Sequence, residues 1–67
     1  MTLTINGEQR SIPSSRITVR ELLGQLELVP ETVVVELNRS IVPRGRYQEA
    51  LVKEGDVLEI VRVVGGG

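Results

Sequence analysis

The sequence predicts an α+β domain in which a mixed sheet of four or five strands has one main helix packed on one face. Three observations support this fold class. Short runs of β-branched or alternating apolar residues, typical of strands, fill most of the chain. Only residues 18–28 have the apolar spacing of an amphipathic helix. The length of 67 residues is that of one small domain with a thin core.

The first element expected is a β-hairpin. Residues 2–5 alternate polar and apolar side chains, Asn6 and Gly7 follow, and residues 8–12 continue the extended pattern. Both central residues of a type I′ turn need positive φ, which Asn and Gly tolerate best. Three apolar side chains of this hairpin are expected to face the core: Leu3, Ile5 and Ile12.

The helix is expected to begin at Thr18. Thr18 and Glu21 form the Thr-x-x-Glu pattern, in which each side chain caps the backbone of the other. Pro30 prevents the helix from continuing, so we expect it to end at residues 27–28. Gly24 lies within it at a cost of about 1 kcal/mol relative to alanine, which close packing on the sheet would explain. The apolar stripe consists of Val19, Leu22, Leu23 and Leu26.

Three further strands are expected after the helix. Residues 32–37 are mostly β-branched, and residues 41–42 suffice only for a short edge strand, which Pro43 ends because it has no N–H to pair. Residues 44–52 form a loop with room for one turn of helix. Residues 57–64 form the longest strand. Two apolar side chains of this loop are expected to hold it against the core: Ala50 and Leu51.

Alternation along the last strand divides its side chains between two faces of the sheet. Leu58 and Ile60 would lie under the helix, which leaves Val61 and Val63 on the opposite face. Val34 on the neighbouring strand would join them, because one helix covers only one face. The sequence therefore predicts an exposed patch of these three valines, the valine patch, as a partner-binding surface. The alternative is that they are ordinary surface valines.

The last three residues, Gly65, Gly66 and Gly67, are predicted to form a flexible tail after a domain of residues 1–64. Glycine has no Cβ, so an extended triglycine segment can enter a narrow channel. The α-carboxylate of Gly67 is ionised at neutral pH and can attack an activated phosphate. The alternative is a frayed end or linker without a role.

The composition argues against catalysis by the chain itself. It has no Cys and no His, which removes thiol nucleophiles, imidazole bases and the usual zinc ligands. Eight basic residues, nine acidic residues and the single aromatic Tyr47 offer nothing typical of nucleic-acid binding. No apolar run is long enough for a membrane span or a signal peptide. We expect a cytoplasmic protein that is not an enzyme by itself and has no bound cofactor or metal.

The predicted order of elements resembles the β-grasp fold, in which the last strand lies beside and parallel to the first. A protruding Gly-Gly end on this order resembles ubiquitin. A narrower resemblance covers the whole chain, and its residues are Asn6-Gly7-Glu8, the helix of residues 18–26, Asn38 followed by Ile41-Val42-Pro43-Arg44, Gly55-Asp56, and Val64-Gly65-Gly66-Gly67. This combination is similar to the ThiS family, the sulfur carrier proteins of thiamine biosynthesis.

The resemblance implies a mechanism for the C-terminus. The carboxylate of Gly67 would be adenylated with ATP and Mg²⁺ by a ubiquitin-activating-like adenylyltransferase (ThiF). It would then become a thiocarboxylate with sulfur from a cysteine desulfurase or another donor, and deliver sulfur to thiazole synthase (ThiG). Gly66, which has no side chain, would keep the terminal segment narrow, and Gly65 would extend this narrow segment by one residue. No residue of the chain would be catalytic, because partner enzymes supply those groups.

Three other functions remain open from the sequence. The small subunit of molybdopterin synthase also ends in Gly-Gly and carries a thiocarboxylate, but it is usually longer and richer in aromatic residues. A ubiquitin-like modifier would be joined to targets through Gly67, with Lys53 as the only lysine available for chains built on itself. A plain interaction domain would have incidental glycines.

Overall fold

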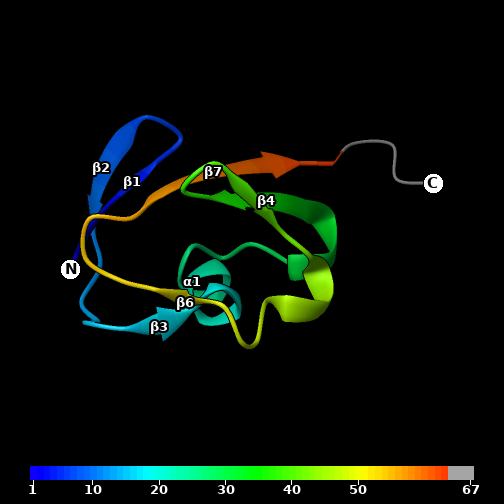
Figure 1. Ribbon diagram of the computed structural model, residues 1–67, viewed down its shortest axis with the longest axis horizontal. Coiled ribbons are helices and arrows are strands. Elements are labelled where there is room, and N and C mark those ends of the chain that lie inside the picture. The colour runs from blue at the N-terminus through cyan, green and yellow to red at the C-terminus, as the bar shows by residue number, and fades with distance from the viewer. Residues whose placement is uncertain (64–67) are drawn as a thin grey trace.

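One five-stranded sheet forms a layer of the protein, and helix α1 packs against one of its faces (Figure 1). The computed structural model describes residues 1–63. In spatial order the strands are β2 (Glu8–Ser11), β1 (Thr2–Ile5), β7 (Val57–Arg62), β4 (Val33–Leu37) and β5 (Ser40–Val42). β1 and β7 are parallel, and the other neighbours are antiparallel. The predicted mixed sheet, with the last strand beside the first, is confirmed.

The first hairpin has the predicted turn. Asn6 and Gly7 have φ values of 52° and 83°, as a type I′ turn requires. Pairing of Leu3 with Arg10 and of Ile5 with Glu8 sets the register of the two strands. The three side chains predicted for the core, Leu3, Ile5 and Ile12, are buried.

Helix α1 (Val19–Gln25) begins as predicted and ends two to three residues before the predicted end. Thr18 caps it, and both halves of the capping box with Glu21 are present. At its end, Glu27 N–H donates to the Gly24 carbonyl (3.1 Å), and Leu28 N–H donates to the Leu23 carbonyl (2.9 Å). This is a Schellman motif, and Glu27 occupies its left-handed position with φ of 60°. The helix therefore ends at Gln25 through this motif, five residues before Pro30.

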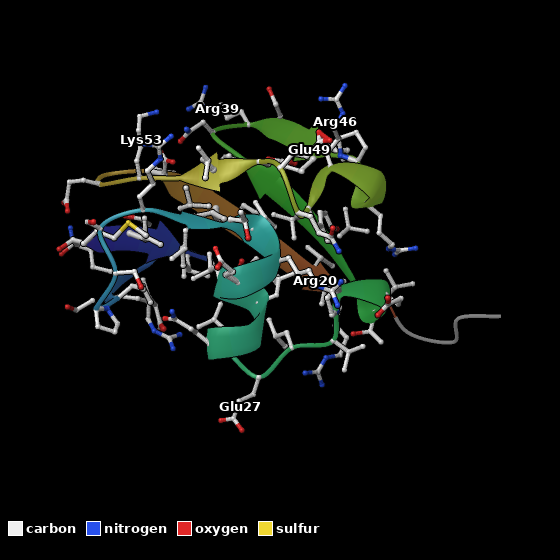
Figure 2. All side chains as sticks on the ribbon, turned by 90° about the horizontal axis from the view of Figure 1, so that it is seen from below. Arg20, Glu27, Arg39, Arg46, Glu49 and Lys53 are labelled. Atoms are coloured by element: carbon white, nitrogen blue, oxygen red, sulfur yellow. The ribbon has the colours of Figure 1, made fainter. Side chains whose placement is uncertain are left out.

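Gly24 does not pack closely on the sheet. A Cβ at this position would meet no atom within 4 Å, so the predicted reason for the glycine is wrong. Figure 2 shows the neighbouring Glu27 pointing away from the body of the protein at this end of α1. The apolar stripe itself is confirmed, since Val19, Leu22 and Leu23 are buried and Leu26 packs partly buried against the core.

A small second sheet lies outside the main sheet and was not predicted, whereas the turn of helix expected within residues 44–52 is present as a 3₁₀-helix. A second, two-stranded sheet pairs β3 (Ile17–Thr18) with β6 (Leu51–Val52). Short 3₁₀-helices, η1 (Pro30–Thr32) and η2 (Arg44–Arg46), precede β4 and follow β5.

Leu51 was predicted to hold residues 44–52 against the core, but it is 44% exposed. Alternation along β6 directs Val52 inward instead, and Val52 is fully buried. Tyr47 provides the second anchor, because its buried hydroxyl donates to the Val33 carbonyl (3.1 Å). Ala50 is partly buried against the core, as predicted.

Candidate functional site

β7 is the central strand of the sheet and leads directly to the C-terminal residues (Figure 1). Leu58 and Ile60 are buried beneath the helix layer, whereas Val61 is 60% exposed on the opposite face. The alternation predicted for this strand is therefore confirmed. Beyond the strand, Val63 N–H donates to the Thr32 carbonyl (2.8 Å), so the pairing with the β4 side continues to the last described residue.

The structure brings the predicted valine patch together on the uncovered face, which we call the open face. Val34 lies directly opposite Val61 in the β4–β7 pairing and is 38% exposed. Val63 is 45% exposed beside them. The exposure of all three residues is as predicted, and their role in partner binding stays a prediction.

The open face is more extensive than the sequence indicated. Ile41 on β5 lies opposite Glu36 and is 66% exposed, and Val57 is exposed at the start of β7. Glu36 also lies opposite Glu59 on β7. Sequence reasoning missed Ile41 as a member of this face because a two-residue edge strand does not reveal its own register.

Asn6 anchors β7 near its C-terminal end. Its amide Nδ2 donates to the Ile60 carbonyl (3.1 Å), and its Oδ1 accepts from the Ile60 N–H (2.7 Å). The side chain thereby extends the pairing between β1 and β7 beyond the last paired residue, Ile5. It fixes the strand two residues before the end of its regular structure at Arg62.

A second asparagine anchors the other end of β7. Asn38 Oδ1 accepts from the Val57 N–H (2.9 Å), and Nδ2 donates to Asp56 Oδ1 (3.1 Å). Asp56 is buried at 6% exposure, and its Oδ2 accepts from the Lys53 N–H (2.9 Å). Asn38 has φ of 49°, so both anchors are left-handed turn residues. The sequence marked Asn6 as a turn residue, but the contacts of the two asparagines with β7 were not predicted.

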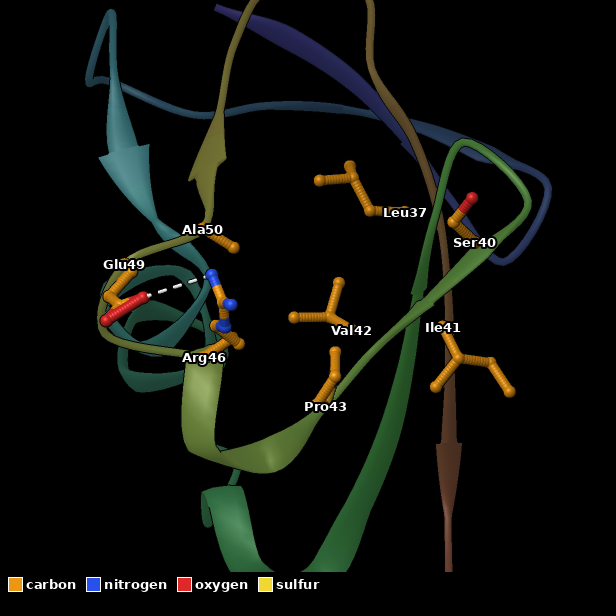
Figure 3. A pocket seen from close by; sticks show the side chains of 8 residues that line it. All are labelled: Leu37, Ser40, Ile41, Val42, Pro43, Arg46, Glu49 and Ala50. Carbon is orange, nitrogen blue, oxygen red and sulfur yellow. Dashed lines mark hydrogen bonds and ion pairs between the residues drawn. The ribbon is translucent and has the colours of Figure 1, made fainter.

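One hollow lined by described residues lies away from the end of β7. It has a volume of about 370 Å³ and lies between β5 and the segment of residues 46–50 (Figure 3). Its lining is mainly aliphatic, with the ion pair of Arg46 and Glu49 (3.5 Å) on one side. Within residues 1–63, no group of three or more acidic, His or Cys side chains is arranged to hold a metal ion.

The residues predicted to bear the chemistry lie outside the part of the chain that the structure describes. These are Gly67, as the modified residue, and Gly65 and Gly66, as the remainder of the tail. The predicted domain boundary at residue 64 also falls there. What the structure does describe is the support for that tail: a central strand with hydrogen-bonded anchors at both ends and an open apolar face.

Comparison with known proteins identifies the family. The family model described as "ThiS family" matches residues 3–67. The sulfur carrier protein ThiS of Bacillus subtilis is 37% identical over 65 residues, which cover 97% of this chain and 98% of that protein. The crystal structure of the thiamine biosynthesis protein (ThiS) from Geobacter metallireducens has a TM-score of 0.88 and 36% identity, with both chains fully covered.

A second kind of relative is much longer. Thiazole synthase of Paramagnetospirillum magneticum is 48% identical over 67 residues, and the chain spans only 20% of its length. Thiazole synthase of Magnetococcus marinus is 37% identical, and the chain again spans 20% of its length. The β-grasp fold and the narrower resemblance predicted from the sequence are thus both confirmed, and the chain belongs to the ThiS family.

Proposed function

We propose that this protein is a sulfur carrier of thiamine biosynthesis and that the carboxylate of Gly67 is the group that receives the sulfur. The observation that supports this most directly is the family match, which extends through residue 67 and so includes the three terminal glycines. The anchored β7 supports it further, because hydrogen bonds at both ends hold in place the strand that leads to the C-terminal residues.

The proposed chemistry has two steps. A carboxylate oxygen of Gly67 attacks the α-phosphorus of ATP, and pyrophosphate leaves, which forms an acyl adenylate. A sulfur nucleophile at the oxidation level of sulfide then attacks the acyl carbon, and AMP leaves with the former carboxylate oxygen. The product is a thiocarboxylate that can pass its sulfur to thiazole synthase. The acyl adenylate is a good acyl donor, so each step requires little from the carrier itself.

Partner enzymes would supply the catalytic groups. The lack of Cys and His in the sequence supports a carrier that is a co-substrate and not an enzyme. We propose an ATP- and Mg²⁺-dependent adenylyltransferase, a cysteine desulfurase or other sulfur donor, and thiazole synthase as partners. The two long relatives support the last of these, because a segment similar to this chain is part of proteins named thiazole synthase.

The valine patch is proposed to be the docking surface for the adenylyltransferase. Exposed apolar side chains at the end of β7 are the contacts nearest to the tail, and burying them would hold the domain while the tail enters the active site. No helix among residues 1–63 is long and apolar enough to cross a membrane. We propose a cytoplasmic location, where ATP and the partner enzymes would be available.

Alanine substitution in the tail tests the proposed function. Gly66→Ala or Gly67→Ala should lower the rate of adenylation by about a hundredfold, because a Cβ displaces the reacting carboxylate in a narrow channel. Thermal stability should not change, because residues at a chain end make few contacts. Pyrophosphate release measures the first step, and the intact mass measures replacement of oxygen by sulfur.

Gly45→Ala is the matched control. Gly45 lies in η2, and a Cβ there would meet no atom within 4 Å. The control should be adenylated at the wild-type rate. Equal rates for all three variants would contradict the narrow-channel argument, and attachment of the wild type to lysines of other proteins would identify a modifier instead.

A further inference from the structure

Two glutamates face each other on the open face without compensation. Glu36 on β4 lies directly opposite Glu59 on β7. Side chains in such cross-strand positions have Cβ atoms about 5 Å apart, and like charges there destabilise the sheet. Residues 1–63 contain two ion pairs, Arg46 with Glu49 and Lys53 with Asp56, and neither involves these glutamates. Two adjacent strands of the sheet therefore hold a like-charged pair on the open face.

Apolar side chains surround this pair on the same face. Ile41 lies beside Glu36 in the same row of the sheet. Val34 and Val61 form the next row toward the end of β7, and Val57 precedes Glu59 by two residues. These four side chains are exposed, so any protein that covers them also covers the glutamates. Covering the two glutamates removes the water around their carboxylates. Their attraction to a cation becomes stronger, and burying the two charges without a cation becomes more unfavourable.

We infer that the open face binds thiazole synthase through one arginine of that enzyme, whose guanidinium lies between Glu36 and Glu59. This inference rests on the proposed function, since it identifies how a proposed partner is recognised. Charge complementarity selects a cationic side chain. Geometry selects arginine, because a planar guanidinium has five N–H donors and can bond two carboxylates at once. The surrounding apolar side chains would pack around the guanidinium and exclude water from it.

Thiazole synthase is the occupant that the relatives indicate. In two of them a segment similar to this chain belongs to a protein with that name, so the two units are joined in one polypeptide there. The open face also includes β7, which leads to the C-terminal residues. Docking through this face therefore brings β7, the strand that precedes the C-terminal residues, against the enzyme proposed to receive the sulfur.

The test is the double variant Glu36→Gln/Glu59→Gln. Binding of the full chain to thiazole synthase is measured by titration calorimetry at several salt concentrations, together with urea unfolding of the free protein. We expect Kd to rise about tenfold or more and its salt dependence to become weaker, because charged hydrogen bonds across the interface are lost. Stability should stay equal or rise, because the like-charge contact is gone. The single variant Glu59→Gln should show a smaller rise in Kd and a smaller gain in stability.

Glu8→Gln/Glu31→Gln is the matched control. It removes the same charge from two exposed positions on β2 and η1. The inference is overturned if the wild type does not bind thiazole synthase, or if the test variant binds that enzyme as tightly as the wild type does. It is also overturned if the control weakens binding to the same extent, or if the test variant loses affinity only for the adenylyltransferase. Thiocarboxylate formation on Gly67 is measured in parallel. Its absence in the wild type would contradict the proposed function separately.

Discussion

The covered and open faces of the sheet contain the same kinds of aliphatic residue in very different environments. Leu3, Val35 and Leu58 on the covered face are completely buried, whereas Ile41 and Val61 on the open face are more than half exposed. β4 and β7 contribute to both faces through alternating side chains. The difference arises from α1, which covers one face only. Apolar groups on the covered face hold the fold together, and those on the open face remain available for binding.

The largest effect on folding is expected on the covered face. Leu22 is fully buried in α1, so Leu22→Ala should lower the free energy of unfolding by about 2 to 5 kcal/mol through lost burial and a residual cavity. Leu51→Ala is the matched control, because Leu51 is an exposed leucine and should cost about 0.5 kcal/mol or less. Urea unfolding measures both. Equal losses of unfolding free energy in the two variants would contradict the conclusion that α1 covers one face of the sheet.

A smaller effect is expected at Asn6, which anchors the strand shared by both faces. Asn6→Gly keeps the positive φ but removes two hydrogen bonds to Ile60, so it should destabilise the fold by about 1 to 3 kcal/mol. Asn6→Asp keeps the acceptor for the Ile60 N–H and should cost less. Hydrogen exchange at the Ile60 amide should speed up in the glycine variant and stay slow in the aspartate variant. Identical protection in both would show that β7 does not depend on this anchor.

The smallest effect on folding is expected on the open face. Val61→Asp should change the free energy of unfolding by about 0.5 kcal/mol or less, because the side chain is already in water. The same variant should weaken binding to the adenylyltransferase by placing an unpaired charge in the interface. Unfolding is measured in urea and binding by calorimetry. A variant that unfolds would contradict the exposure of this face, and one that binds normally would place the docking site elsewhere.

Local sequence patterns predicted most of the elements but not all of their ends. The Asn6-Gly7 turn and the capping box of Thr18 depend on residues within three positions of each other, and both are present. The end of α1 was less predictable, because a glutamate occupies the left-handed position where glycine is the usual signal. The β3–β6 pair was missed because two-residue strands have too little alternation to detect.

The candidate site likewise has features that the sequence predicted and features that it did not. Exposure of Val61 followed from the alternation of β7 and the presence of a single helix, both visible in the sequence. The anchoring role of Asn6 could not be predicted, since its partner Ile60 lies 54 residues away and Asn-Gly signals a turn whatever surrounds it.

What the sequence alone determined is therefore most of the elements, the faces taken by the apolar side chains of α1 and β7, and the glycine-rich end after the last strand. These depend on periods of two and 3.6 residues and on short-range capping, which act between near neighbours. The β-grasp resemblance predicted that the last strand lies beside the first, but only the tertiary structure decided the β3–β6 pairing and the register between the distant strands β4 and β7. Register sets Glu36 opposite Glu59, because strand pairing joins distant segments and a shift of one residue would send one of the two side chains to the other face.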